Sequence, residues 1–351
     1  MPIRINFFEE RLARFRRFSR EDIADRWKKG IFHRRFWSFR KRTRISLRNG
    51  EMFCSFDRET LDVWHWSTWK RRHIDVAELI AEAIPRLCVG KIPPFFVSLR
   101  DRPLRNSRRH HTRFAQCTAD GSPDVAAPDF VFGGWPEAQF DDFDAKTVSI
   151  TAASAIPARD DRAGWCGRNN TPWREKLFEL AGARPDLIDA RDTMAGYDEV
   201  AHVYRDGFVP MENQAADYRY LIDIEGNGYS GRLKLLLHAQ RVVFLQAYPW
   251  QEWFMPLMQP YRHYVPVKRD LSDLIDRIEW LRQHPEVEAE IIREAQLFAR
   301  TWLTRATAIA EWARLLEKHV AAGGRLSSGL EDRSPPDLQP QILAVQELGR
   351  S

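Results

Sequence analysis

The order of apolar and polar positions along the chain predicts strands and helices in alternation. Alternating apolar residues make 51–69 a region of strands, and an apolar run at 93–101 ends in charged residues, as a strand end often does. Residues 74–87 repeat apolar positions at helical spacing. Residues 102–128 are rich in Arg, Ser and Pro and are expected to form a loop. Residues 128–137 are expected to form a short strand that ends in a Gly-Gly turn.

The second half of the chain predicts a strand–helix–strand unit and therefore a parallel sheet. Its segments are the strand 220–226, the helix 232–239 and the strand 241–246. Upstream, residues 146–154 are expected to form a strand or a linker, and a helix is expected to start with Thr171 as its N-cap and Pro172 in its first position. Downstream, two helices are expected over 271–284 and 286–317.

The composition is that of a soluble globular protein. Of 351 residues, 44% are hydrophobic and 29% are charged, and this length suits two domains. The chain has no apolar run long enough to span a membrane and no early apolar stretch that would suit a signal peptide, so a cytoplasmic location is expected. The four cysteines form no C-x-x-C pair, which favours a reducing compartment and neither a disulfide framework nor a zinc site.

Changes in composition divide the chain into four expected segments. These are a basic aromatic segment over 1–50, an N-terminal domain over 51–145, a C-terminal domain over 146–320 and a flexible tail over 321–351. The tail is assigned because AAGGRLSSGLEDRSPPDLQPQ is rich in Gly, Ser and Pro.

The positive charge is concentrated at the start of the chain. Residues 1–50 contain 16 Lys and Arg against 5 Asp and Glu, a net charge of +11, whereas the rest of the chain has 38 against 44, a net charge of −6. Cations alternate with aromatics here, which suits an anionic membrane surface or a phosphate backbone. The alternative is a solvated helix that packs its aromatic side chains on the body. No nucleic-acid-binding motif is present, so nucleic acid is not an expected partner.

The stretch YLIDIEGNGYSGRLKLLLHA, residues 220–239, suits an anionic ligand. Three glycines let the backbone approach a ligand without Cβ clashes: Gly226, Gly228 and Gly231. Ser230 is expected to cap the following helix, whose first N–H groups attract an anion. Arg232 and Lys234 add positive charge where the helix dipole is already positive, so a bound diphosphate would stabilise both. The spacing matches neither a P-loop nor a dinucleotide-binding turn, and the alternative is a plain glycine-rich turn.

A second glycine turn enters the other predicted helix at GRNNTPWR, residues 167–174, with arginines at both ends. Two such turns facing one cleft would hold both ends of a nucleotide's diphosphate.

Two runs of the chain resemble glycosyltransferase family 90. They are YRYLIDIEGNGYSGRLKLLLHAQRVVFLQ and EWFMPLMQPYRHYVPVKRDLSDLIDRIEWLRQHPE, and the resemblance is strongest over residues 160–300. That family contains the protein O-glucosyltransferases and the fungal capsule-associated xylosyltransferases. The resemblance implies an α/β fold that is GT-B-like, with two Rossmann-like domains and a cleft between them. It also implies a UDP-sugar donor, UDP-glucose or UDP-xylose, inversion at the anomeric carbon and no metal or other cofactor. On this basis 51–145 is the acceptor-side domain and 146–320 the UDP-sugar-binding domain.

The resemblance also assigns site residues. The family's contacts to the diphosphate and sugar match Asn227, Gly228, Tyr229, Ser230, Gly231 and Arg232. In the upstream turn Arg174 matches the family's arginine, whereas Arg168 stands where a serine is expected. The general base matches Asp101, in the run SLRDRP, and its alternative is a salt bridge with Arg100 or Arg102.

Three further residues are expected to contact the sugar or the acceptor. Phe132 and Trp135 flank the Gly-Gly turn that falls where the family contacts substrate. Glu252 follows a predicted strand where a GT-B fold often contacts ribose or sugar, and its alternative is a surface carboxylate.

The resemblance therefore implies an inverting, metal-independent transferase that moves glucose or xylose from a UDP-sugar to a hydroxyl group. The expected acceptor is a glycan or a lipid-linked or lipopolysaccharide-type sugar, because the basic segment would place the protein at the inner face of a membrane. The alternative is a noncatalytic protein that binds a membrane or nucleic acid through this segment.

Overall fold

A computed structural model of the chain describes residues 3–7, 51–57, 60–65, 70–88, 91–103, 111–193, 197–198, 203–204 and 208–327. Most of the basic segment and the tail from 328 onward lie outside these residues, so both predictions stay untested. The chain forms two compact units. The N-terminal unit contains Met1–Phe130 and Ile309–Gly329, and the C-terminal unit contains Val131–Ala308.

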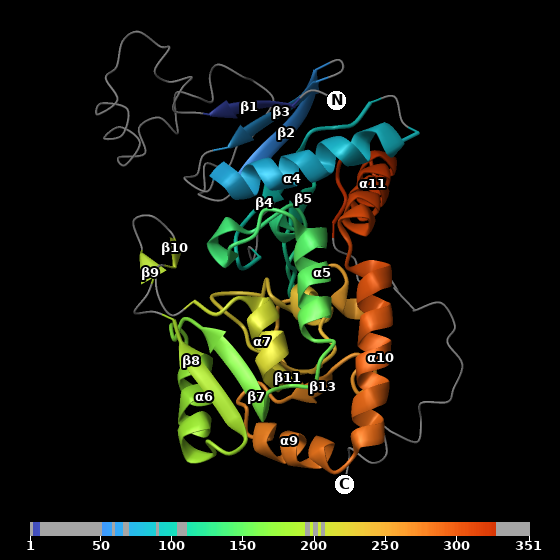
Figure 1. Cartoon of the computed structure of the whole chain (residues 1–351). Helices are drawn as coiled ribbons and strands as arrows, with labels where there is room; N and C mark the ends of the chain where they lie inside the picture. Colours follow the sequence, from blue (N-terminus) through green and yellow to red (C-terminus); the bar gives the residue numbers. More distant parts are fainter. Residues whose placement is uncertain are drawn as a thin grey trace, which may run out of the picture. The chain divides into compact units, whose positions relative to one another are not determined.

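The N-terminal unit contains a mixed six-stranded sheet (Figure 1) in the order β1-β3-β2-β4-β5-β6. Its strands are β1 (Ile3–Phe7), β2 (Glu51–Asp57), β3 (Thr60–His65), β4 (Phe95–Ser98), β5 (Arg113–Ala115) and β6 (Val125–Ala126). β2 pairs antiparallel with β3 and β4, whereas β1 with β3, β4 with β5 and β5 with β6 are parallel pairs.

Two helices pack on this sheet. α4 (Lys70–Ala83) contacts β1 and β3, and a 3₁₀ turn at Ile84–Arg86 follows it. α11 (Arg305–Ala321) packs its Trp312 ring edge-on against Phe114 of β5, with 5.3 Å between the ring centroids. Farther along α11, His319 is buried and hydrogen-bonds to Thr112 Oγ1.

The C-terminal unit is built on a five-stranded sheet in which every pair is parallel, in the order β13-β12-β11-β7-β8. The strands are β7 (Asp160–Gly167), β8 (Ile188–Asp192), β11 (Tyr218–Asp223), β12 (Val242–Gln246) and β13 (Val265–Val267). The chain runs from β7 outward to β8, then returns past β7 to β11 and continues in the other direction. This is a doubly wound order, and the direction reverses between β7 and β11. The short strands β9 (Tyr197–Asp198) and β10 (Val203–Tyr204) form a separate antiparallel pair.

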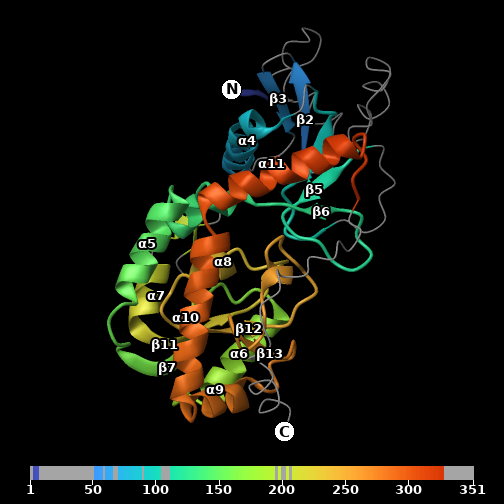
Figure 2. The same cartoon turned by 90° about the vertical axis from the view of Figure 1, so that its right-hand side faces the viewer.

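The helices of the C-terminal unit are α5 (Phe143–Ala153), α6 (Pro172–Ala183), α7 (Met211–Asp217), α8 (Leu233–Leu236), α9 (Leu274–Arg282) and α10 (Pro285–Trp302). α6 contacts β8 (Figure 1), α9 contacts β13 and α10 contacts β12 (Figure 2). α7 contacts β7 and β11, and α5 packs on α7 and α8. Among these helices, α6, α9 and α10 supply side chains to the main hydrophobic core.

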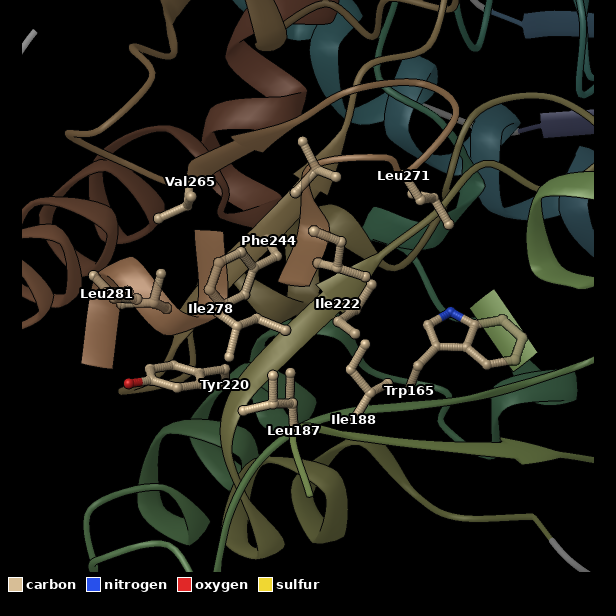
Figure 3. Close-up of a cluster of buried hydrophobic side chains, with 14 of the residues drawn as sticks. Trp165, Leu187, Ile188, Tyr220, Ile222, Phe244, Val265, Leu271, Ile278 and Leu281 are labelled. Atoms are coloured by element: carbon tan, nitrogen blue, oxygen red, sulfur yellow. The ribbon is translucent and has the colours of Figure 1, made fainter. Parts of the chain in front are cut away.

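This core lies against one face of the parallel sheet (Figure 3). Tyr220 and Ile222 of β11 point into it together with Trp165 of β7, and Ile278 of α9 lies among them. Because side chains alternate along a strand, Asp223 belongs to the opposite face of β11. The core thus fixes the ends of the strands, and the buried carboxyl group of Asp223 lies at the last residue of the central strand, β11.

The α/β class and the parallel sheet predicted for the second half are confirmed. The expected cleft between two domains concerns their relative placement and stays a prediction. The domain limits differ from the expected ones: residues 131–145 belong to the C-terminal unit because α5 packs on α7 and α8, and most of α11 belongs to the N-terminal unit.

Four predicted elements are corrected. Residues 146–153 belong to the helix α5 and Ser154 is its C-cap, whereas its N-cap Asp142 accepts a hydrogen bond from Ala145 N. The presumed loop 102–128 contains β5 and β6, and 128–137 contain two 3₁₀ turns instead of a strand. The single helix expected over 286–317 is two helices, α10 and α11. Among the helices that the structure describes, none combines the length and hydrophobicity needed to cross a bilayer.

Candidate functional site

The two predicted glycine turns are neighbours in the C-terminal unit. One follows β7 and the other follows β11, and these two strands pair in parallel at the point where the strand order reverses. In open α/β sheets, ligands bind beyond the carboxyl ends of the strands at this point, where the following loops diverge. The topology therefore places the candidate site between loops 168–171 and 224–232.

Arg174 joins the two loops. It lies in the first turn of α6, which begins as predicted: Thr171 Oγ1 accepts a hydrogen bond from Arg174 N at 3.4 Å, and Pro172 follows the cap. Its Nη1 donates to the backbone oxygen of Arg168 at 2.8 Å. A Cβ atom on Gly226 would lie 3.2 Å from Arg174 Nη2, so this guanidinium contacts the second turn directly.

Arg232 reaches the same place from the second turn. Its Nη1 donates to the backbone oxygen of Cys166 at 2.6 Å, and its Cζ lies 5.3 Å from the centroid of the Trp165 ring. Arg174 Cζ lies 5.2 Å from that same ring. Both guanidinium groups thus contact the Trp165 ring, and cation–π attraction to this ring favours two positive charges close together at the end of β7.

Asp223 balances part of this charge. Its side chain is fully buried, its Oδ1 accepts a hydrogen bond from Ser230 Oγ at 2.6 Å, and it lies 3.9 Å from Arg232 Nη2. Burial raises the pKa of Asp223 to about 6, against the opposing effects of Arg232, the Ser230 hydrogen bond, Arg174 and Lys234.

Several polar atoms of this group lack a hydrogen bond. Arg232 Nη2, Asp223 Oδ2 and Trp165 Nε1 are among the buried side-chain atoms of the described residues that have no hydrogen-bond partner. Buried polar groups in native proteins are nearly always paired, so an unpaired buried donor on a cation is consistent with a site that a ligand completes.

The remaining predicted contacts form an adjoining cluster. Lys234 Nζ and Glu252 Oε1 form a buried ion pair at 2.5 Å, so the expected alternative of a surface carboxylate at Glu252 is wrong. Lys234 Nζ also lies 5.2 Å from the centroid of the Tyr229 ring and 5.9 Å from that of Phe132. Much of the charge of Lys234 is therefore compensated within the protein, and it is not the free cation that the sequence predicted.

Trp135 borders the glycine turn. A Cβ atom on Gly231 would lie 3.2 Å from the Trp135 ring, so a residue larger than glycine would push this ring away from the turn. Gly226 N donates to Gly228 O at 3.1 Å, which closes the turn, and Asn227 at its tip is exposed.

The predicted role of Ser230 as a helix cap is wrong. Arg232 occupies the N-cap position of α8, and no side chain caps this helix. Ser230 Oγ instead bonds Asp223. Since α8 is only four residues long, its dipole is small, and side-chain cations are the main source of positive potential.

Three contributors were missed from the sequence: Trp165, Asp223 and Glu225. Glu225 is buried, and its carboxylate accepts hydrogen bonds from Trp250 Nε1 at 2.8 Å and Arg269 Nη2 at 3.2 Å. The available signal was two acids, Asp223 and Glu225, at the end of an otherwise apolar strand.

Asp101 lies in the other unit, after β4. Its side chain is 48% exposed and lies 3.8 Å from Arg72 Nη1 of α4, a partner that the sequence did not suggest. Its backbone oxygen accepts a hydrogen bond from Cys117 Sγ at 3.5 Å. The exposed carboxylate is accessible to a substrate.

The described part of the chain contains no group of three or more His, Cys, Asp and Glu side chains arranged to hold a metal ion. Metal independence stays a prediction.

Comparison with known proteins identifies the family. The model of glycosyl transferase family 90 matches residues 65–321. Human protein O-glucosyltransferase 3 is 27% identical over 261 residues, which cover 70% of this chain and 50% of the relative. Protein O-glucosyltransferase 2 of Danio rerio is 28% identical over 243 residues, 64% of this chain and 47% of the relative. The chain thus spans about half the length of these relatives.

A solved structure of Anabaena Alr3699/HepE in complex with UDP and glucose aligns with a TM-score of 0.33 and 13% identity, over 51% of each chain. The family assignment rests on the sequence match, which includes both glycine turns and Asp101. The chain therefore belongs to glycosyl transferase family 90.

Proposed function

We propose that this protein is an inverting, metal-independent glycosyltransferase that uses a UDP-sugar as its donor. The observation that carries the proposal is the pair Arg174 and Arg232, which meet at the Trp165 ring beyond the parallel sheet. Two guanidinium groups presented beyond neighbouring strands suit a diphosphate, because each combines a permanent positive charge with N–H donors that match phosphate oxygens.

The reaction proceeds by displacement at the anomeric carbon. A hydroxyl group of the acceptor forms the new bond to this carbon, the bond from carbon to the diphosphate oxygen breaks, and UDP leaves with the electron pair. Asp101 accepts the proton of the attacking hydroxyl group. Arg174 and Arg232 stabilise the negative charge that develops on the departing diphosphate.

The transferred sugar is glucose or xylose, with glucose favoured by the names of the relatives. The test is a panel of UDP-sugars scored for thermal stabilisation and for slow hydrolysis without acceptor, with ATP as the comparison. We expect UDP-glucose or UDP-xylose to stabilise the protein and to release UDP slowly. Stabilisation by ATP alone would instead indicate another phosphate chemistry.

Substituting Gly226 by alanine is expected to weaken donor binding with little effect on folding. The new Cβ atom would lie 3.2 Å from Arg174 Nη2 and displace this guanidinium by a few tenths of an ångström. The affinity for UDP should fall by up to about tenfold, because this shift weakens, without abolishing, a hydrogen bond to a charged group that is worth about 1.5–3 kcal/mol in full. Calorimetric titration with UDP measures the effect.

The control is Gly182→Ala in α6, where an added Cβ atom has no neighbour within 4 Å. This variant should bind UDP normally and be slightly more stable, because alanine restricts the unfolded chain. Equal affinities in the two variants would mean that Arg174 does not contact the donor.

The acceptor is a glycan or a lipid-linked or lipopolysaccharide-type saccharide at an anionic membrane surface. This proposal rests on the net charge of +11 in residues 1–50, mixed with aromatic residues. Changing the Lys and Arg residues of 8–45 to Gln, which keeps β1 intact, should reduce sedimentation with anionic vesicles at low salt. Unchanged sedimentation would contradict this location.

A further inference from the structure

We propose that Asp223 is a positioning residue that takes up a proton when the UDP-sugar binds. The inference rests on the proposed function and deepens it, since it describes how the same site accommodates the two negative charges of a sugar-nucleotide diphosphate. Three observations support it: Asp223 is completely buried, it accepts a hydrogen bond from Ser230, and it lies beside Arg232, which is also the proposed partner of the diphosphate.

Asp223 organises the turn that presents Arg232. It is the last residue of β11, where the sheet fixes its backbone, and its Oδ1 accepts the Ser230 Oγ hydrogen at 2.6 Å across the glycine turn. Arg232 is held on one side by Cys166 O and on the other by the charge of Asp223 at 3.9 Å. The carboxyl thus restrains both the turn and the arginine before any ligand arrives.

The charged groups around Asp223 make its ionisation sensitive to a ligand. Arg232 is the strongest favourable influence, Arg174 of α6 and Lys234 of α8 act from farther away, and Lys234 is itself paired with Glu252. A diphosphate would draw on the same guanidinium groups and add negative charge beside a carboxylate that has no access to water. Both effects disfavour the ionised carboxyl, so a proton from solvent restores the balance.

The free protein is poised for this uptake. With a pKa of about 6, Asp223 is mostly ionised at pH 7. Only about one-tenth of such a group is protonated at pH 7, and a rise of two pKa units on binding would give an uptake of about 0.8 proton. Its Oδ2 is buried without a hydrogen-bond partner among the described residues, so a proton there displaces no existing bond.

The sign of the pH dependence follows from this shift. Because the bound state holds the proton more tightly, affinity is highest at low pH and falls as pH rises through the interval from about 6 upward. For a rise of one to two units, the Kd of UDP-glucose should increase roughly 5- to 25-fold from pH 6 to pH 8. UDP-glucose is the suitable probe because its diphosphate does not titrate near neutrality, unlike that of UDP.

The test is calorimetric titration of the full chain with UDP-glucose at pH 7 in PIPES and in Tris, whose ionisation enthalpies differ. The difference in observed enthalpy gives the number of protons taken up. We expect a positive uptake in the wild type, none in Asp223→Asn, and undiminished uptake in Asp160→Asn. Asp160 is the matched control because it lies at the opposite end of β7 and its Arg162 partner holds its pKa below the usual range.

Each outcome is decisive. Binding without proton uptake in the wild type, or equal uptake in Asp223→Asn, would overturn the inference and leave the proposed function intact. Failure of every UDP-sugar to bind the wild type would overturn both. If Asp223→Asn does not fold, Ser230→Ala replaces it: loss of the bond to Oδ1 leaves Asp223 more protonated before binding, so the uptake measured at pH 6 must fall below that of the wild type at the same pH, and an unchanged value would contradict the inference.

Discussion

Replacing Asp101 by asparagine is expected to lower sugar transfer by about 10²–10⁴-fold while leaving the affinity for the donor within about twofold. An amide cannot accept the proton of the acceptor hydroxyl group, but nothing that holds the diphosphate changes. Folding should be preserved, because Asp101 is half exposed and its ion pair with Arg72 is long, at 3.8 Å. Release of UDP with simple glycosides as acceptors measures the rate, and calorimetry measures donor affinity.

The matched control is Asp120→Asn, an exposed aspartate in the turn that follows β5 of the same unit. It should retain wild-type transfer. Near-normal turnover in Asp101→Asn would remove this residue from the mechanism, and the exposed carboxylate would then be no more than a surface partner of Arg72.

Replacing Arg232 by lysine is expected to reduce turnover by about 10²–10³-fold and to weaken donor binding, since one lost donor to a developing charge costs about 2.7–4 kcal/mol. Lysine keeps the positive charge but lacks the planar fork. In the wild type, Nη1 of Arg232 bonds Cys166 O and Nη2 has no hydrogen-bond partner, so Nη2 can bond a phosphate. A lysine has a single nitrogen and cannot make both bonds in this geometry. Rates and Kd values for UDP-glucose, measured together, separate the two effects.

Arg300→Lys provides the control, because Arg300 is an exposed arginine on α10. Both variants preserve the net charge, so a difference between them reports the geometry of the guanidinium group. If Arg232→Lys kept both turnover and affinity, the proposed diphosphate contact would be wrong.

The features predicted correctly from the sequence are those that local chemistry determines. Thr171 and Pro172 fix the start of α6 because an N-cap and a proline in the first turn act through neighbouring residues alone. The strand at β11, the glycine turn and the strand at β12 follow from apolar runs interrupted by glycine. These elements imply a parallel sheet, and the sheet brings the two turns together.

The errors arose where pairing partners are distant in sequence. β5 is three residues long and exists because it pairs with β4 and β6, so nothing in its own composition marks it as a strand. The segment 146–154 is rich in Thr, Val and Ile, which favour strands, yet it is helical because Asp142 caps α5 and the helix packs on α7.

The charges of the site show the same limit. Arg232 and Lys234 are equivalent in the sequence, but only the fold brings Glu252 against Lys234 and leaves Arg232 Nη2 without a hydrogen bond. Likewise, Ser230 has the sequence position of a helix cap, but its hydroxyl group donates a hydrogen bond to the buried carboxyl of Asp223 instead. Burial decides which polar group binds which, and a single sequence does not show burial directly.

The central claim is that Arg174 and Arg232 together bind the diphosphate of a UDP-sugar. A crystal structure of the protein with UDP tests it most directly. The account predicts phosphate oxygens within hydrogen-bonding distance of both guanidinium groups, beside Gly226 and the Trp165 ring. A diphosphate bound elsewhere, with Arg232 Nη2 still unpaired, would contradict it.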